Sequence, residues 1–444
     1  MVEINIQQAD KHLLLEKLIT ELFPKTTKNW IPGVDTVQYA GSYFDEKEFI
    51  AGIKSFLKGW LALGEDGIKF ENKFPFYLGK EHGCLTNSGS SANLLMISAL
   101  SSKKLYNLPK GTKIITPVAG FPTTVNPILQ NGYEPVFIDI ELKTLNLNID
   151  QLELAAKQGA KCLIFAHVLG NPPNMDKIME IVDRYNLILL EDCCDALGST
   201  YKNQKLGSFG DMSSCSFYPA HHITMGEGGF VASKSKEIEM VIKSFREWGR
   251  GCYCSGKSAS CLKNGMCKKR FSNWLPALPN EIFDHKYVYE EIGYNLKPLE
   301  LQASIGLVQL EKLTEIIEKR KNNYKKLFNI FNKYSDKFIL PEATIGSDPA
   351  WFAFPLTVKE NVKFTRTEFT MFLEENKIQT RNYFGGNLLL QPAYANLVAN
   401  GENPIIKFPQ ATKATTNTFF LGTSPVITEE QIDYISSVVD KFFK

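Results

Sequence analysis

The residues whose types and spacing could support chemistry gather in one stretch, Ser213 to Gly229, which reads SSCSFYPAHHITMGEGG. The run through Ser216 and Phe217 predicts the end of a strand, and the glycines that follow predict a turn into another strand. The loop between them would then lie at the carboxyl end of a strand, where open α/β sheets bind ligands. His221 lies in this loop and is the residue whose role must be explained. The alternative to a functional role is a core histidine in an unrelated α/β loop.

A second signal comes from the cysteines, of which there are nine. Cys252, Cys254, Cys261 and Cys267 follow one another closely, and Cys194 lies far upstream. An odd number of cysteines argues against a disulfide framework and favours buried thiols together with a metal site. Four thiolates bind zinc as readily as an iron–sulfur cluster, so the residues alone leave both open.

The composition bounds the remaining possibilities. The chain has 444 residues, is 44% hydrophobic and 22% charged, and carries a formal net charge of +2. It offers no basic stripe for nucleic acid. The start of the chain lacks the pattern of an export signal, and no window reaches the roughly 18 apolar residues of a membrane span. We therefore expect a cytoplasmic protein that binds neither nucleic acid nor membrane.

Short apolar runs alternate with helical patterns from Gly83 onward, which predicts an α/β fold with a mostly parallel sheet. Between Gly251 and Lys286 the alternation stops, and a segment of this kind inside a compact domain is usually functional or disordered. Its four cysteines favour a function. We expect a large domain over residues 1–310 and a smaller C-terminal α/β domain over 311–444. The expected strands are 113–115, 135–140, 162–168, 187–190 and 352–358, and the expected helices are 92–100, 175–185, 296–318, 366–376 and 429–443.

Two further groups of residues could bind a ligand. In TNSGSSANLL, Ser88, Gly89 and Ser90 stand just before a helix, whose N-terminal N–H groups can bind a phosphate. Isolated strings of this kind are often only helix N-caps. Asp192 closes the apolar run LILLED, so its carboxylate would be delivered at a strand end. A helix N-cap is again the simpler alternative.

Together these motifs resemble the DegT/DnrJ/EryC1/StrS family of sugar aminotransferases, enzymes that use pyridoxal phosphate (PLP). The family pattern is roughly SF-x-P-x-K-x-x-x-x-GEGG, and His221 stands where the family keeps the lysine that binds the cofactor covalently. The resemblance implies the fold of PLP-dependent aminotransferases (fold type I). A chain that keeps this frame without the lysine is similar to the sugar 3-dehydratases of the family, which use pyridoxamine phosphate (PMP).

The resemblance also implies roles for individual residues. Ser88, Gly89, Ser90 and Ser216 would bind the phosphate, Phe121 would stack on the ring, and Asp192 would pair with the pyridine nitrogen. Asn295 would reach the phosphate of a neighbouring subunit, which requires a homodimer. Asp195 and Tyr218 flank the substituted loop and depart from the aminotransferases together with His221. We group these three as catalytic, since departures that cluster indicate a changed reaction rather than a non-catalytic pseudoenzyme.

The cysteines fit the same resemblance. The wide separation of Cys194 and Cys252, the string EWGRGCYC and the string KKRF are similar to the iron–sulfur dehydrase of the family. That enzyme carries a [2Fe–2S] cluster, which implies Cys194, Cys252, Cys254 and Cys267 as ligands. Cys261 remains an alternative fourth ligand, and Cys193 an alternative upstream ligand.

The activity implied is the C-3 dehydration and deoxygenation of CDP-4-keto-6-deoxyglucose, a step toward the 3,6-dideoxysugars of lipopolysaccharide O-antigens. Its partners would be the nucleotide sugar and an NAD(P)H-dependent iron–sulfur flavoprotein reductase. Alternatives are a cluster-free GDP-4-keto-6-deoxymannose 3-dehydratase and a non-catalytic scaffold stabilised by zinc. Residual aminotransferase activity is a further alternative, although no lysine neighbours His221.

Overall fold

The structure is a computed structural model that describes residues 8–23, 30–251 and 270–444. Within them a seven-stranded sheet forms the centre of the large lobe, in the order β1-β9-β8-β5-β4-β2-β3. The pairs from β8 to β3 are parallel, and β9 pairs antiparallel with both β1 and β8. The mostly parallel sheet expected from the sequence is therefore present. Its strands are β1 (His82–Thr86), β2 (Lys113–Pro117), β3 (Glu134–Ile138), β4 (Cys162–Ala166), β5 (Ile188–Asp192), β8 (Met212–Ser216) and β9 (Gly229–Ser233).

Side chains on the central strands alternate between two apolar layers. On β4, Cys162 and Ile164 join the core on one face of the sheet, and Leu163 and Phe165 join the core on the other. Successive residues of a strand point to opposite faces, and a parallel sheet is covered on both, so such strands are apolar throughout. This is why the buried strands stand out in the sequence as continuous apolar runs.

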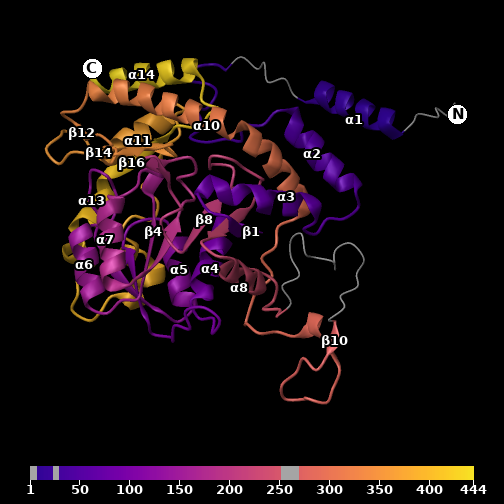
Figure 1. The fold of residues 1–444 in the computed structure, drawn as a ribbon. Coiled ribbons are helices and arrows are strands. Elements are labelled where there is room, and N and C mark those ends of the chain that lie inside the picture. Colours follow the sequence, from indigo (N-terminus) through magenta and orange to yellow (C-terminus); the bar gives the residue numbers. More distant parts are fainter. Residues whose placement is uncertain (1–7, 24–29, 252–269) are drawn as a thin grey trace.

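Helices cover both faces of this sheet (Figure 1). Helix α4 packs against both α5 and α8 on one face, and α6 and α7 form a pair on the other. The expected helix 175–185 agrees with the observed bounds of α7, and the expected strands agree within a few residues. The helices are α3 (Glu65–Lys73), α4 (Gly89–Ala99), α5 (Pro122–Gln130), α6 (Ile149–Lys157), α7 (Met175–Tyr185) and α8 (Lys236–Arg246).

One long helix, α10 (Glu300–Asn332), connects the two lobes. In Figure 1 it runs from beside α2 (Glu46–Leu57) and α3 to beside α14 (Glu429–Phe443). It begins later and ends well beyond the expected helix 296–318. The domain boundary expected between residues 310 and 311 falls inside this unbroken helix, and the division of the chain there stays a prediction.

The small lobe is built on a four-stranded antiparallel sheet in the order β12-β14-β16-β15. Its core is rich in aromatic rings that contact edge to face, among them Phe331, Phe338 and Phe369. Its elements are β12 (Phe338–Ile339), β14 (Ala353–Val358), α11 (Arg366–Glu375), β15 (Arg381–Asn382), α12 (Pro404–Lys407), α13 (Pro409–Asn417), β16 (Thr418–Gly422) and α14.

Smaller elements complete the described chain. Helix α1 (Gln8–Leu22) packs on α2, and two minor sheets are formed by β10 (Phe271–Ser272) with β11 (Phe283–Asp284), and by β13 (Ser347–Asp348), β6 (Thr200–Tyr201) and β7 (Gln204–Lys205). The stretch expected as a loop over 251–286 thus includes a short β-ribbon. Short 3-10 helices cover Phe74–Leu78, Val168–Gly170, His285–Tyr287, Leu388–Leu390 and Pro392–Leu397. Among helices of the described residues, none combines the length and apolar composition that spanning a bilayer requires.

Candidate active site

A cavity of about 760 Å³ lies at the carboxyl ends of β5 and β8. The two strands are hydrogen-bonded neighbours, so the segments that follow Asp192 and Ser216 enter the same space. Part of its wall comes from the small lobe, through Arg381, Asn382 and Phe420. The predicted site residues that line the cavity are Ser88, Gly89, Ser90, Phe121, Asp192, Cys194, Asp195, Ser216, Tyr218 and His221.

The predicted phosphate loop forms the N-terminus of α4. Ser88 is the N-cap, and its hydroxyl accepts a hydrogen bond from the Ser91 N–H at 3.1 Å. A Cβ placed on Gly89 would come within 2.5 Å of the Ser216 Cβ and 3.0 Å of the Cys194 Sγ. Glycine is therefore required for the loop to pass this close to β8. The N–H groups of a helix N-terminus at the cavity wall form a cradle that fits a phosphate.

Asp192 is held firmly at the end of β5. Its Oδ2 accepts hydrogen bonds from Asn93 Nδ2 at 2.7 Å and from Thr124 Oγ1 at 2.8 Å. Its Oδ1 accepts a hydrogen bond from the Cys194 N–H at 3.1 Å and a longer one from Ser214 Oγ. These donors fix the direction of the carboxylate without neutralising it. The arrangement fits a group that must meet the protonated nitrogen of a cofactor ring.

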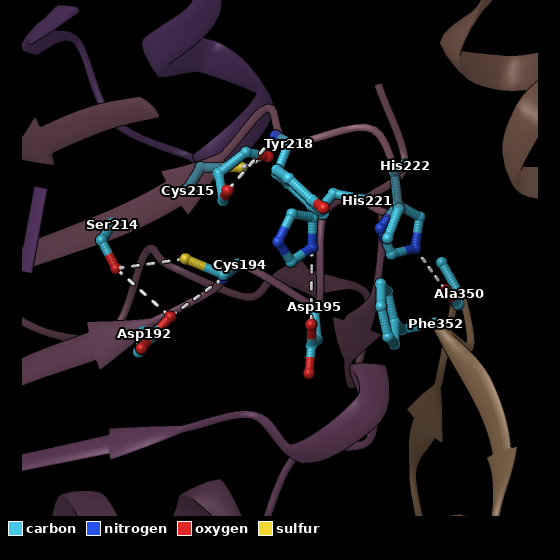
Figure 2. Close-up of polar contacts among 12 residues, drawn as sticks. Asp192, Cys194, Asp195, Ser214, Cys215, Tyr218, His221, His222, Ala350 and Phe352 are labelled. Atoms are coloured by element: carbon cyan, nitrogen blue, oxygen red, sulfur yellow. Dashed lines mark hydrogen bonds and ion pairs between the residues drawn. The ribbon is translucent and has the colours of Figure 1, made fainter. Parts of the chain in front are cut away.

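His221 lies between the segment after β5 and the small lobe (Figure 2). Its Nδ1 is 3.5 Å from Asp195 Oδ1, an ion-pair distance at which no hydrogen bond is formed. Its ring centroid lies 5.3 Å from that of Phe352 and 6.5 Å from that of Tyr218. The side chains of His221 and Asp195 are 16% and 12% exposed, and both face the cavity. The Nδ1 nitrogen is therefore buried beside Asp195 without a hydrogen-bond partner.

Burial shifts the protonation of both residues. Desolvation lowers the pKa of His221 to about 4, and the nearby Arg320 cation acts in the same direction. Desolvation raises the pKa of Asp195 to about 8, and the neighbouring Asp192 carboxylate raises it further. At neutral pH the imidazole is therefore uncharged and able to accept a proton, and the Asp195 carboxyl retains one.

Cys194 is the predicted metal ligand that the structure describes. Its Sγ lies in the cavity wall, 4.0 Å from Ser214 Oγ, and burial raises the pKa of its thiol well above the usual value. The alternative upstream ligand, Cys193, is fully buried in the apolar core below the sheet end. The other proposed ligands, Cys252, Cys254 and Cys267 with the alternative Cys261, lie outside the described residues. The ligand set therefore stays a prediction.

Three predicted residues lie at the margin of the cavity or outside it. Phe121 and Tyr218 line it with about half of each side chain exposed, which leaves their faces open to a ligand. Asn295 is exposed and does not line the cavity of its own chain. Its Oδ1 accepts a hydrogen bond from Lys297 Nζ at 2.8 Å. The role expected for Asn295 requires a second subunit and stays a prediction.

Several residues of the site escaped the sequence analysis. Asn93 lies one helical turn after Gly89, so the spacing of the phosphate loop could have revealed it. Thr124 follows Phe121 in the first turn of α5, where a polar side chain can point back toward the strand ends. Arg320 has no such signal, because it stands in the basic run EKRKNNYKK and is distinguished only by its complete burial.

Comparison with known proteins agrees with this geometry. A 3-dehydratase from Saccharopolyspora spinosa, named for dTDP-4-dehydro-2,6-dideoxy-D-glucose, is 39% identical over 93% of this chain and 88% of its own length. The lipopolysaccharide biosynthesis protein RfbH of Salmonella typhimurium is 42% identical over 100% of this chain and 99% of its own.

Among solved structures, an E. coli GDP-4-keto-6-deoxy-D-mannose-3-dehydratase with bound hydrated PLP superposes with a TM-score of 0.77 at 28% identity. The match covers 90% of this chain and 98% of that one. The fold is thus that of the PLP-dependent aminotransferases. A family model matches residues 44–440. The chain belongs to the DegT/DnrJ/EryC1/StrS aminotransferase family.

Proposed function

We propose that the chain is a PMP-dependent 3-dehydrase that acts on CDP-4-keto-6-deoxyglucose in the biosynthesis of 3,6-dideoxyhexoses. The observation that carries the proposal is the identity of the base in the cavity. His221 occupies the position of the family lysine, and none of the described residues that line the cavity is a lysine. An aminotransferase of this fold needs that lysine to hold its cofactor and release its product. A dehydratase needs only a base.

The residues of the cavity suit PMP. The N-terminus of α4 would hold the phosphate, Asp192 would meet the ring nitrogen, and Phe121 would lie against the ring. When bound, PMP would supply the amine that condenses with the sugar ketone and a ring that withdraws electrons.

The chain itself would supply the proton transfers. His221, neutral at physiological pH, would take up the proton whose removal leads to departure of the C-3 hydroxyl. Asp195, within 3.5 Å of Nδ1, can exchange a proton with the imidazole or hold its orientation. Tyr218 lines the same space with about half of its side chain exposed, and its hydroxyl would contact the sugar.

The named relatives support the reaction more strongly than the nucleotide. Relatives at 39% and 30% identity are both named as 3-dehydratases, one for a dTDP-linked and one for a GDP-linked sugar. RfbH is named for lipopolysaccharide biosynthesis, where dideoxysugars occur. The CDP-linked sugar, like the iron–sulfur cluster and its reductase, comes from the sequence resemblance.

We include a [2Fe–2S] cluster bound by Cys194, Cys252, Cys254 and Cys267 in the proposal. Dehydration alone leaves an unsaturated sugar, and full deoxygenation adds two electrons that a cluster can pass one at a time from a flavoprotein reductase. The position of Cys194 in the cavity wall supports this arrangement, since it would bring the cluster close to the reacting sugar. The proposal also includes a homodimer, in which Asn295 of each subunit would reach the cofactor phosphate bound in the other.

The first experiment is iron and acid-labile sulfide analysis of anaerobically purified protein, with a visible spectrum. We expect about two irons and two sulfides per chain. The visible absorption of the cluster should bleach when NAD(P)H and a flavoprotein reductase reduce it. Zinc without labile sulfide would contradict the electron-transfer step. If the zinc protein binds PMP, we would interpret it as a cluster-free GDP-4-keto-6-deoxymannose 3-dehydratase. If it does not bind PMP, we would interpret it as a non-catalytic scaffold stabilised by zinc.

A matched pair of variants assigns the upstream ligand. Cys194→Ser should lose the iron and sulfide, whereas Cys193→Ser, one residue away but in the apolar core, should retain both. The reverse result would assign Cys193. Turnover of CDP-, GDP- and dTDP-linked 4-keto-6-deoxy sugars by the same preparations would then decide the nucleotide.

A further inference from the structure

Arg320 is a buried cation that bonds to backbone oxygens. It lies on α10 and is 1% exposed. Its Nη1 donates a hydrogen bond to the Phe352 carbonyl at 3.0 Å. Its Nη2 donates to the carbonyls of Ala220 and His221, both at 2.9 Å. No carboxylate of the described residues forms an ion pair with it, which is unusual because a buried charge is normally paired.

The three carbonyls belong to two different parts of the molecule. Ala220 and His221 lie on the loop between β8 and β9 in the large lobe. Phe352 immediately precedes β14 in the small lobe. The guanidinium has donors in a fixed planar fork, so one side chain can join carbonyls that lie in different directions. Arg320 therefore connects the histidine loop to the small lobe.

Other contacts hold the same loop from neighbouring sides. The His221 N–H donates to the Tyr218 carbonyl at 2.9 Å, which closes a tight turn. The His222 ring bonds to the carbonyl of Ala350, two residues before Phe352. The His221 ring lies against the Phe352 ring, as Figure 2 shows. Contacts with the small lobe therefore place His221. Arg320 is the residue whose side chain bonds to the backbone carbonyl of His221 itself.

We propose that Arg320 is the positioning residue for His221: by joining the carbonyls of Ala220 and His221 to that of Phe352, it sets the direction of the imidazole in the cavity. This inference rests on the proposed function of His221 as the base. Arg320 does not line the cavity and touches neither substrate nor cofactor. It holds the loop through these hydrogen bonds, and Arg320→Lys, which keeps the charge, separates this role from the effect of the charge on His221.

Substitution of Arg320 separates this role from simple stabilisation. Arg320→Met removes all three hydrogen bonds, and Arg320→Lys keeps the charge but cannot bridge carbonyls as the guanidinium does. Lys321→Met is the matched control, since Lys321 is the next residue on α10 and pairs at the surface with Asp348 at 2.6 Å.

The first readout is steady-state kinetics on the PMP-loaded enzyme. Misplacement of a catalytic group costs on the order of 100-fold in rate, so we expect kcat to fall by about that factor in Arg320→Met. Arg320→Lys should fall between this variant and the wild type. The KM for the nucleotide sugar should stay the same in both, and Lys321→Met should match the wild type.

The second readout is amide hydrogen exchange of the peptide that covers 217–225, measured without substrate. We expect faster exchange in both Arg320 variants and no change in Lys321→Met. Unchanged exchange would overturn the proposal, as would faster exchange with kcat intact. If Arg320→Met fails to fold, Arg320→Lys decides by the same criteria. Absence of dehydratase activity in the wild type would instead contradict the proposed function, while the exchange result would still report whether Arg320 holds the loop.

Discussion

Two of the places where the large lobe buries charged side chains compensate those charges in opposite ways. Beside β1, Glu71 of α3 bonds to Lys243 Nζ at 2.9 Å and to Arg246 Nη1 at 2.6 Å, both on α8. We call these three residues the ionic cluster. In the active site, Asp195 lies 3.5 Å from a neutral histidine, and Arg320 bonds to carbonyls rather than to a carboxylate. The same residue types are thus paired in one region and left unpaired in the other.

The pKa values follow from this difference. In the ionic cluster, ion pairing outweighs desolvation: the two cations lower the pKa of Glu71 to about 2, and the carboxylates of Glu71 and Glu239 raise the pKa of Lys243 above its usual value. In the active site, desolvation dominates instead. It raises the pKa of Asp195 to about 8 and lowers those of His221 and Arg320, to about 4 and about 10.

The comparison separates groups that stabilise the fold from groups that are kept ready to exchange protons. A paired buried charge lowers the energy of the folded state relative to a broken pair, and it is chemically inert. A buried group whose charge is left uncompensated is held away from its preferred protonation state, as is typical of functional sites. Substitutions in the two regions should therefore affect different measurements.

The largest effect is expected at the active site. His221→Asn keeps the approximate shape of the side chain and removes the base, so dehydration should fall by about 10² to 10⁴-fold. PMP binding and the denaturation midpoint should stay near the wild-type values, because the imidazole contributes no ionic pair. His222→Asn is the matched control, since that ring bonds to the Ala350 carbonyl in the core and does not line the cavity. It should reduce stability and lower the rate of dehydration far less than His221→Asn does, because it removes one contact of the loop and keeps the base.

Substitution in the ionic cluster should give the opposite pattern. Glu71→Gln removes the carboxylate that the two buried cations share, while Lys243 keeps its pair with Glu239 and Arg246 its pair with Glu247. The free energy of unfolding should therefore fall by less than the about 3–5 kcal/mol that removal of the sole partner of a buried charge costs. Urea denaturation monitored by fluorescence measures the loss. The kcat of the PMP-loaded enzyme at a permissive temperature should remain unchanged. A fall in kcat without a fall in stability would remove the distinction between the two regions.

The same variant predicts a pH dependence. The pKa of Glu71 is about 2 in the folded protein and about 4.3 in an unfolded chain. The carboxylate therefore contributes stability that is fully present above the unfolded value and is lost as the pH falls toward the folded value. The stability difference between wild type and Glu71→Gln should be constant from pH 8 to 6. It should shrink below about pH 4.5, and a gap that stays constant down to pH 3.5 would contradict the assignment.

Much of the active site was predictable, because its residues stand at places that local patterns mark. Asp192 ends an apolar strand, Ser88 and Gly89 begin a helix, and His221 stands in a glycine-bounded loop after β8. Each position lies where the hydrophobic pattern of one element ends and that of the next begins. The topology of the sheet then brings all of these positions to the same edge. The bounds of α7 and α14 were predictable for a similar reason, since both have strong apolar periodicity and an N-cap residue.

What the sequence concealed depends on contacts between distant segments. Glu71 and Arg246 are 175 positions apart, and nothing in the helices that carry them indicates that the two would be buried together. Arg320 is surrounded in sequence by lysines that remain at the surface. The sequence also predicted too short a helix for α10. The second half of this helix packs into the core of the small lobe, and its apolar residues do not continue the stripe of the first half. Burial of a charged residue is a property of the tertiary structure, and periodicity does not report it.

The smallest effect is expected for a pair of helix caps, one from each region. Ser88 caps α4 at the cavity, and Ser235 caps α8, the helix that carries Lys243 and Arg246. Each hydroxyl accepts one backbone N–H of its own helix, at 3.1 Å and 3.4 Å. Replacement of either serine by alanine should cost about 1 kcal/mol of stability.

The two variants should differ in PMP binding. Ser88→Ala also removes a hydroxyl from the proposed phosphate cradle, and loss of one hydrogen bond to a charged group weakens binding by about 10-fold. Ser235→Ala should bind PMP like the wild type, which isothermal titration with PMP can measure. Equal affinities in the two variants would show that Ser88 only caps its helix. The phosphate would then be held by the backbone N–H groups of α4 and by Ser90 and Ser216, and the serine of the cavity would serve stability in the same way as the serine beside the ionic cluster.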